Sequence, residues 1–307
     1  MSKLSVIIPF CNEHPQVLFT IQNIAQELRD RADFEIIAVN NYCDDVAKQG
    51  RIEDDAGNAI KSSVPGNKWL KYLTYTDKLS HWQSKNLAVK NSTGDILVFI
   101  DAHCIVARDA LFKMFDCYSQ HHEELNGTIH LPLTYKILES RKLIYKLQTD
   151  IDKGIVHYTF TSYRDSDIPY EVPCMSSCGS MMTRKLYDQI NGWPTELGIY
   201  GGGENYLNFV LAILGKKKWI MPGGALHHHG DKRGYNWNAT DFIRNRTIAS
   251  YMYGDQELAR KYIDNSKGDK QILDNIYNEV IIKCQSHRNI IKAQQVINIE
   301  DWLKNHI

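Results

Sequence analysis

Hydrophobic and polar positions follow two different periods along the first hundred residues. Short apolar runs rich in β-branched residues predict buried strands, and they alternate with segments whose apolar residues recur every three to four positions. The predicted strands cover residues 4–10, 34–39, 69–75 and 96–100, and the predicted helices cover residues 16–29 and 84–90. Alternating strands and helices are typical of an α/β fold with a right-handed, mostly parallel sheet.

The pattern is looser after residue 110. The predicted elements are helices over residues 111–118 and 204–214, strands over residues 128–133, 179–183 and 218–221, a loop over residues 229–238, and helices from residue 241 to residue 304. We therefore expect one α/β domain over residues 1–240, with halves that meet at residue 110. A helical C-terminal extension over residues 241–307 is expected to follow it.

Polar clusters follow three of the predicted strands. They cover residues 11–13, 40–45 and 101–103. In a parallel sheet the ligand binds beyond the carboxyl ends of the strands, where these clusters would meet. Their convergence predicts a binding site at this edge.

Charge and cysteine content narrow the classes of protein. Lysine and arginine total 36, as do aspartate and glutamate, so a surface that grips nucleic acid throughout is disfavoured. The lysines at 216–218, with Lys232 and Arg233, stay open as either a local basic patch or a solvated turn. Seven cysteines without C-x-x-C spacing suggest free thiols. No apolar window is long enough for a membrane span or a leader, so a cytoplasmic protein is expected.

Two groups of residues have side chains suited to a metal ion. Asp101 and His103, one residue apart after an apolar strand, offer the carboxylate and imidazole that suit Mn²⁺ better than Ca²⁺. The three histidines at 227–229 follow a later strand, and we expect at least one of them to be a ligand. The alternatives are an ordinary strand-end turn and a solvent-facing loop.

A glycine-rich turn precedes the predicted helix at residue 204. Gly201, Gly202 and Gly203 would let the backbone approach a ligand closely, and Glu204 would project from the first helical turn into the same crevice. The alternative is a capping turn with glutamate in its favoured position.

These motifs together resemble a known family. Residues 5–13 resemble the opening strand of family 2 and related glycosyltransferases of the GT-A fold. Further resemblance is to the polypeptide N-acetylgalactosaminyltransferases: residues 39–45 to their uridine motif, residues 101–104 to their D-S-H-C metal motif, and residues 201–207 to their W-G-G-E-N-L helix start. Lys85 and Asn86 resemble the family's R-N pair, and the spacing from Pro222 to His228 resembles its third metal ligand.

The resemblance implies a GT-A domain with a nucleotide-binding half over residues 1–110 and an acceptor and metal half over residues 111–240. It implies transfer of a sugar from a nucleotide-sugar donor, with UDP favoured, onto a hydroxyl acceptor. The expected metal is Mn²⁺ or Mg²⁺, and its expected ligands are Asp101, His103 and His228. The residues expected to bind the donor with its metal are Pro9, Cys11, Asn12, Glu13, Asn40, Asn41, Lys85, Asp101, Ala102, Gly202, Gly203 and Tyr235, and those expected to act in catalysis are Glu204, Asn205 and Arg233.

Departures from the family pattern leave several points open. Asn40 and Asn41 replace a pair of aspartates, and Gly201 replaces a tryptophan. Without the family's membrane anchor and lectin domain, a mucin-type acceptor is not implied; a glycan, a protein hydroxyl and a hydroxymethylated DNA base all remain. Retention of configuration is expected, with residues 230–237 as a lid. The alternative is a degenerate protein that binds nucleotide sugars without turnover.

Overall fold

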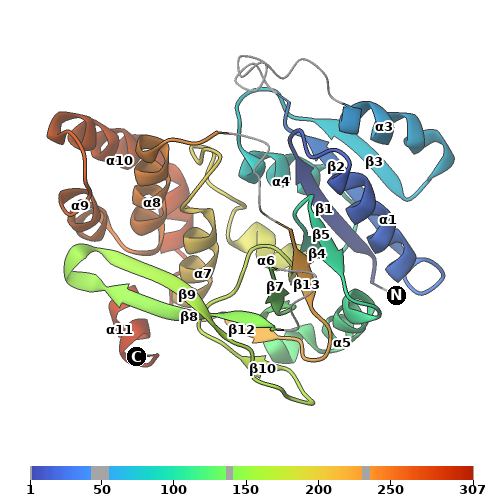
Figure 1. Ribbon diagram of the computed structural model, residues 1–307. Helices are drawn as coiled ribbons and strands as arrows, with labels where there is room; N and C mark the ends of the chain where they lie inside the picture. The colour runs from blue at the N-terminus through green and yellow to red at the C-terminus, as the bar shows by residue number, and fades with distance from the viewer. Residues whose placement is uncertain (1, 43–54, 136–140, 230–235, 307) are drawn as a thin grey trace.

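Parallel strands at the start of the chain form one half of an eight-stranded sheet. The computed structural model describes residues 2–42, 55–135, 141–229 and 236–306. Strand β1 lies between β2 and β4, and β3 follows β2 at the edge of the sheet, all in parallel (Figure 1). These strands are β1 (Leu4–Phe10), β2 (Phe34–Asn40), β3 (Leu70–Thr74) and β4 (Ile96–Phe99). The prediction of a parallel sheet here is confirmed.

Every residue of β1 and β4 is buried. Because helices cover both faces of such a sheet, its strands carry continuous apolar runs rather than alternating ones, which explains the sequence signal. The helices of this half are α1 (Gln16–Leu28), α3 (Asp55–Ser63), α4 (His81–Lys90) and α5 (Ala110–Leu125), with a 3₁₀ turn at Val64–Gly66.

The rest of the large sheet mixes parallel and antiparallel strands. Strand β11 (Ser180–Thr183) runs antiparallel to β4 and to β6 (Gly127–His130), and β12 (Lys217–Ile220) lies parallel to β6. The short β10 (Tyr170–Glu171) completes the edge. The sheet is therefore parallel in its first half and mixed in its second half.

The single strand expected over residues 128–133 is instead two strands in different sheets. Strand β6 ends at His130, and β7 (Leu133–Thr134) belongs to a second, five-stranded sheet. Pro132 lies between them, and because proline has no backbone N–H to donate, a continuous ladder is interrupted there. The Pro132 carbonyl accepts a hydrogen bond from the N–H of Leu226 instead.

The second sheet carries a hairpin that the sequence pattern did not predict. Its strand order is β5, β13, β7, β8 and β9. The hairpin is β8 (Leu143–Asp150) and β9 (Ile155–Ser162), joined by a 3₁₀ turn at Ile151–Lys153. The other two strands, β5 (Cys104–Val106) and β13 (Leu226–His228), pair so that His228 lies opposite Cys104.

Helices dominate the C-terminal part of the chain, as expected. Helix α8 packs against α7, α9 and α10, and α11 packs against α7. Of the helices that are described, none combines the length and apolar character that crossing a bilayer requires. The helices are α6 (Arg184–Gln189), α7 (Gly203–Ile213), α8 (Ala239–Tyr253), α9 (Gln256–Asp264), α10 (Lys270–Lys292) and α11 (Ile299–Lys304).

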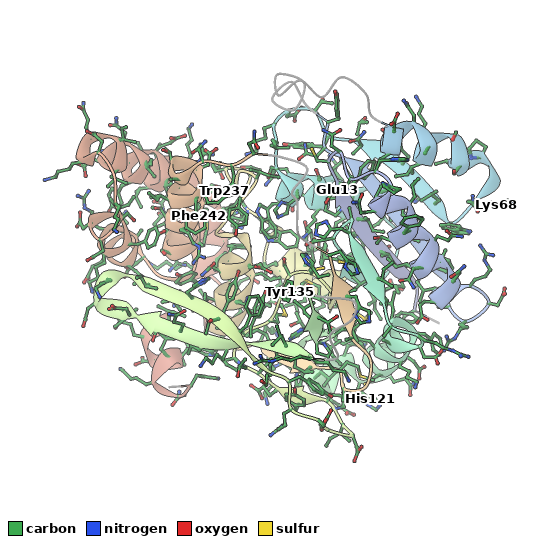
Figure 2. All side chains as sticks on the ribbon, viewed as in Figure 1. Glu13, Lys68, His121, Tyr135, Trp237 and Phe242 are labelled. Atoms are coloured by element: carbon green, nitrogen blue, oxygen red, sulfur yellow. The ribbon has the colours of Figure 1, made fainter. Side chains whose placement is uncertain are left out.

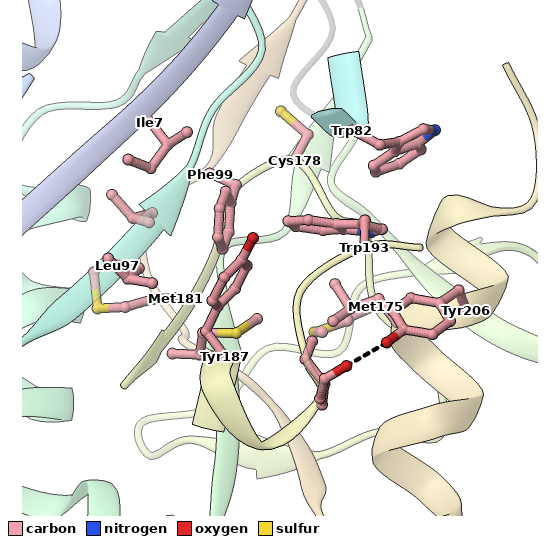
Figure 3. Packing of buried hydrophobic residues seen from close by; sticks show 14 of the residues in the cluster. Ile7, Trp82, Leu97, Phe99, Met175, Cys178, Met181, Tyr187, Trp193 and Tyr206 are labelled. Carbon is pink, nitrogen blue, oxygen red and sulfur yellow. Dashed lines mark hydrogen bonds between the residues drawn. The ribbon is translucent and has the colours of Figure 1, made fainter. Parts of the chain in front are cut away.

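Three aromatic side chains pack together in the core at the carboxyl end of β4, which ends at Phe99 (Figure 3). The rings of Trp82 and Trp193 are 5.4 Å apart, and Phe99 meets Trp193 edge-on at 5.0 Å. Lys85 is fully buried here, with its Nζ 4.7 Å from the Trp82 ring. A buried ammonium is held in a low-dielectric environment, so its position affects the charges next to it.

Candidate active site

Three side chains that can bind a metal converge at the carboxyl end of β4. Asp101, His103 and His228 each offer one ligand atom, and these atoms all lie within 4.8 Å of one another. The His103 and His228 Nε2 atoms are 3.1 Å apart, and the His228 Nε2 is 3.3 Å from Asp101 Oδ2. One carboxylate and two imidazoles suit Mn²⁺ and related divalent ions. The structure brings together the three residues that the sequence predicted as ligands.

The ring of His227, the preceding residue of β13, points away from the candidate metal group, as alternation along a strand predicts. The Nδ1 of His227 pairs with the hydroxyl of Thr134 on β7. His229 donates its backbone N–H to the carbonyl of His103 at 2.9 Å. Strand β13 thus fixes His228 as the one histidine of the three whose ring faces Asp101.

Glu13 orients His103 from the end of β1. Its Oε1 lies 2.5 Å from Nδ1 of His103, and its Oε2 accepts the N–H of Cys11 at 3.1 Å. A carboxylate at Nδ1 fixes the histidine tautomer that leaves Nε2 free for a metal. Glu13 was expected to bind the donor. Its contact with His103 instead suits it to orient a candidate metal ligand.

Lys85 compensates the charge of Asp101 from within the core. Its Nζ is 3.7 Å from Asp101 Oδ1. Burial opposes ionisation of Asp101, but the charge of Lys85 and the hydrogen bond from His228 outweigh it and hold the carboxyl pKa well below its usual range. Lys85 was expected to contact the donor. Its side chain is instead fully buried and contacts Asp101.

A cavity of about 710 Å³ opens in front of the three candidate ligands. Figure 2 shows Glu13 on one side of it, Phe242 on the other and Tyr135 between them. The second wall comes from the β8–β9 hairpin and from α8. The predicted boundary at residue 240 therefore falls within the lining of the cavity, because α8 begins at Ala239 and contributes Phe242.

Glu204 lies on the floor of the cavity and is held by several donors. Tyr158 donates its hydroxyl to one carboxylate oxygen. The other oxygen accepts the backbone N–H of Ser177 at 2.9 Å and lies 3.2 and 3.3 Å from the hydroxyls of Ser177 and Ser176. The carboxylate therefore ties α7 to the hairpin and to the segment before β11.

The glycines before Glu204 are required by packing as well as by the cavity. Gly201 and Gly202 both have positive φ, at 81° and 73°, and both line the cavity. A Cβ on Gly202 would stand 2.0 Å from the carbonyl oxygen of Asn245, and one on Gly203 would stand 2.2 Å from the Trp82 ring. Only glycine fits this approach between two helices.

The side chains of Asn40 and Asn41 form hydrogen bonds within the protein. The Asn41 amide donates to the carbonyls of Tyr75 and Lys78 and accepts the N–H of Ser80, so its side chain is occupied by backbone. Asn40 is buried and donates to the hydroxyl of Tyr72. The expectation that these amides contact a base is not supported by their geometry.

Asn205 is also buried, and it donates to the carbonyl of Val156 at 2.8 Å on β9. It holds the hairpin against α7 and does not line the cavity within the described residues. Its predicted part in catalysis is therefore an indirect one, through the position of the hairpin.

The remaining predicted residues of the first strand end are mostly internal. Pro9 is buried within β1, and Cys11 is 4% exposed. Asn12 has a positive φ of 57°, and its Nδ2 is buried without a hydrogen-bond partner among the described residues. Ala102 is buried, with its carbonyl accepting the hydroxyl of Thr20 at 2.9 Å. Arg233 and Tyr235 lie outside the described residues, as does most of the expected lid.

The lysines at 216–218 are occupied by partners within the protein, and Lys232 and Arg233, the other residues of the possible basic patch, lie outside the described residues. Lys218 is buried, and its Nζ donates to the carbonyl of Asn208, with its pKa lowered by burial to about 8. Lys217 pairs with Glu171 at 3.1 Å, and Lys216 bonds the side chain of Asn126. The solvated-turn alternative fits Lys216, and neither alternative fits Lys218.

Sequence reasoning missed the second wall of the cavity. The rings of Tyr145 and Tyr158 stack at 4.4 Å on the hairpin, and Arg246 of α8 faces His157. The alternation of aromatic with polar residues over residues 155–162 was a usable strand signal. Nothing local in the sequence marked Arg246.

Known proteins share this fold, and the structural similarity covers most of this chain. A crystal structure of GalNAc-T7 with UDP, GalNAc and Mn²⁺ superposes with a TM-score of 0.66 at 14% identity, covering 93% of this chain and 57% of that one. A mannosyltransferase from Pyrobaculum calidifontis, in complex with GDP-Man and Mn²⁺, superposes with a TM-score of 0.53 at 17% identity, covering 95% of this chain and 74% of that one. These likenesses show the GT-A fold.

Sequence comparison also finds N-acetylgalactosaminyltransferases. Polypeptide N-acetylgalactosaminyltransferase 11 of Xenopus tropicalis is 22% identical over 96% of this chain and 56% of its own length. Human polypeptide N-acetylgalactosaminyltransferase 10 is 22% identical over 73% of this chain and 37% of its own length. The chain thus spans about half the length of these relatives or less. The model of the glycosyl transferase family 2 matches residues 5–190, which is more than half of the chain, and the protein belongs to that family.

Proposed function

We propose that the protein is a metal-dependent glycosyltransferase that moves a sugar from a nucleoside-diphosphate sugar to a hydroxyl acceptor. The observation that carries this proposal is the convergence of Asp101, His103 and His228 at the wall of a cavity large enough for such a donor. Two proteins of the same fold bind a nucleotide or nucleotide sugar together with Mn²⁺. The carboxylate and the two imidazoles of this chain suit the same type of ion.

The ion would supply Lewis-acid stabilisation of the diphosphate that leaves the sugar. The protein's own residues prepare the site for it. Glu13 holds His103 in the tautomer whose Nε2 faces the site, and Lys85 keeps Asp101 ionised from behind. Asp101 and His103 therefore each have a neighbour that fixes a protonation state or a direction.

The carboxylates of the cavity support a retaining reaction. An inverting enzyme needs a carboxylate that is free to take the proton of the acceptor hydroxyl. Among the described residues that line the cavity, the only carboxylates are Glu13, Asp101 and Glu204. Glu13 is bound to His103, Asp101 belongs to the candidate metal site, and Glu204 is held by Tyr158 and the serines. Glu204 is then a positioning residue for the hairpin and the floor of the site.

We infer UDP as the nucleotide, since GalNAc-T7 binds UDP and S. aureus TarS, of TM-score 0.56, binds UDP-GlcNAc. The Asn41 side chain contributes by fixing residues 75–80 to the end of β2, so the Asn40 and Asn41 pair need not mean loss of function. This weakens the alternative of a degenerate binding protein. The absence of a lysine patch on the described surface at 216–218 also weakens a DNA acceptor in favour of a glycan or a protein hydroxyl.

The test is a panel of nucleoside-diphosphate sugars with the full chain and Mn²⁺, read by release of free nucleotide diphosphate. The expected result is release from one UDP-sugar that stops when a chelator is added and resumes with Mn²⁺. NMR of the anomeric proton of the first product would then give the stereochemistry. Binding of UDP without any release would favour the degenerate protein, and failure to bind any nucleotide with Mn²⁺ would exclude the proposal.

A further inference from the structure

Arg246 brings a positive charge into the wall of the cavity. It extends from the middle of α8, and it lines the cavity together with Phe242 of the same helix. Its guanidinium lies 5.0 Å from the Phe242 ring. Figure 2 shows Phe242 across the cavity from Glu13, whose partner is the candidate ligand His103. The charge therefore belongs to the wall formed by α8 and the hairpin.

This guanidinium has no acidic partner in the part of the chain that the structure describes. Its Nε is buried and has no hydrogen-bond partner there. Its two terminal nitrogens lie 3.0 Å from Nδ1 and 3.3 Å from Nε2 of His157 on β9. Arginine carries five N–H donors and is charged at any ordinary pH, so most of these donors remain for another group.

His157 cannot supply the missing negative charge. Burial, and then the charge of Arg246, lower the pKa of His157 to about 3, so its ring is neutral near pH 7. A neutral imidazole has one acceptor nitrogen, so the two close pairs with Arg246 contain at most one hydrogen bond. The Nδ2 of Asn205 lies 3.3 Å from the same Nδ1. His157 positions the guanidinium and leaves its charge uncompensated.

The carboxylates of the cavity are held by groups other than Arg246. Asp101 has Lys85 and His228 near it, and the Glu204 carboxylate accepts from Tyr158 and Ser177. An isolated cation at the wall of a cavity is costly unless an anion binds beside it. The planar fork of a guanidinium matches the two oxygens of a phosphate or carboxylate.

We propose that Arg246 binds an anionic group of the acceptor, so that the natural acceptor is a hydroxyl compound that carries a phosphate or a carboxylate. This inference rests on the proposed function, which assigns the donor diphosphate to the side of Asp101, His103 and His228. Arg246 lies on the hairpin side, next to His157, and the adjacent Tyr158 donates to Glu204. An acceptor held there by its anionic group has its hydroxyl directed toward the floor of the cavity.

The experiment compares a neutral sugar with two charged forms of it. Isothermal titration of glucose, glucose 6-phosphate and glucuronate into the full chain, saturated with UDP and Mg²⁺, measures the phosphate and carboxylate arms separately. The expected result is that at least one charged form binds about tenfold or more tightly than glucose, as a charge-assisted bidentate contact allows. The arm with the greater preference identifies the anionic group.

Variants assign this preference to one residue. Arg246→Gln is expected to lose the preference and to bind UDP as the wild type does, and Arg246→Lys is expected to keep part of it. Arg108→Gln removes the same charge from a side chain that is 94% exposed and is expected to change nothing. Thermal unfolding of each variant verifies that it is folded.

Three results would overturn the inference: no preference in the wild type, a preference that survives in Arg246→Gln, or a matching loss of UDP affinity in that variant. The last result would place Arg246 in the donor site. Failure of the wild type to bind UDP would instead count against the proposed function, and the sugars would then be compared without nucleotide.

Discussion

A carboxylate stands at each end of the parallel strands, and the surroundings of the two differ: Glu35 is buried at the amino end, and Asp101 is half-buried at the carboxyl end, where it lines the cavity. At the amino end, Glu35 of β2 accepts the hydroxyl of Ser5 at 2.8 Å and the N–H of Thr93 at 2.5 Å, and it pairs with Lys71 at 2.6 Å. At the carboxyl end, Asp101 lies 3.3 Å from Nε2 of His228 and 3.7 Å from Nζ of Lys85. The Glu35 carboxylate has short contacts with several protein groups. The Asp101 carboxylate has longer contacts and remains open to the cavity.

The two environments lower a pKa in different ways. For Glu35, burial opposes ionisation, but Lys71 and the hydrogen bonds from Thr93 and Ser5 outweigh it and lower the pKa to about 2. For Asp101, the opposing effect of burial is outweighed by the charge of Lys85 and the hydrogen bond from His228, and the ring nitrogens of His103 and His228 beside it are able to bind a metal ion. A closed network stabilises the fold, whereas an open group of ligand atoms leaves room for an ion. The amino end therefore has the geometry of a structural network, and the carboxyl end has the geometry of a candidate metal site.

The largest effect on turnover should follow from removing one of the three candidate metal ligands. His228→Ala is expected to lower Mn²⁺-dependent turnover by at least about 100-fold, because a site with two ligands holds the ion weakly and loses its stabilisation of the leaving group. His227→Ala, on the next residue of β13, is the matched control and should retain most activity. Rates of nucleotide release against Mn²⁺ concentration measure both. Equal rates for the two variants would mean that β13 does not supply the third ligand.

The second effect concerns stability at the carboxyl end. Asp101→Asn should also lower turnover, and it should lower the free energy of unfolding by about 2–3 kcal/mol, because the charge of fully buried Lys85 loses its counter-ion. The double variant Asp101→Asn with Lys85→Met should recover most of the stability and none of the turnover. Urea unfolding of the single and double variants separates the two roles. A single variant as stable as the wild type would show that Lys85 does not depend on Asp101.

Glu13 offers a smaller and more specific effect. Glu13→Gln is expected to weaken metal affinity by about 10–100-fold, because His103 loses the carboxylate that fixes its tautomer. Turnover at saturating Mn²⁺ should fall much less. This division between metal affinity and maximal rate is what a positioning residue predicts. A variant that loses maximal rate with unchanged metal affinity would place Glu13 in direct contact with the substrate.

The same contrast explains what the sequence could predict. Strands β1 and β4 carry unbroken apolar runs because both of their faces are buried, and Asp101 and His103 follow β4 directly. Such local patterns predict the parallel half of the sheet and the edge that carries the site. His228 was found by spacing within a family motif, although it comes from a different sheet.

Contacts between distant segments could not be predicted in this way. The backbone partners of Asn41 lie on an irregular segment after β3, and that path depends on the packing of the whole domain. The charge of Arg246 has meaning only because α8 places it against His157 of the hairpin. In the hairpin, β8 carries no regular alternation of buried and exposed positions, whereas the alternation along β9 was a usable signal that was missed.

The smallest effect should appear at the amino end, where a change affects stability alone. Glu35→Gln is expected to lower the free energy of unfolding by about 1–2 kcal/mol at pH 7 by removing a charged acceptor of hydrogen bonds, with the active site unchanged. Because the folded pKa is about 2 and the ordinary value is 4.5, this contribution is complete above pH 4.5 and declines as the pH falls toward 2.

The difference in unfolding free energy between the wild type and Glu35→Gln should therefore be largest at pH 7 and shrink when measured at about pH 3.5. Glu123→Gln, at an exposed position of α5, serves as the control and should have little effect on stability at pH 7. Urea titrations at the two pH values give the comparison. A difference that stays constant between them would mean that the shape of the Glu35 side chain, rather than its charge, stabilises the amino end. The contrast with Asp101 would then lie in packing rather than in electrostatics.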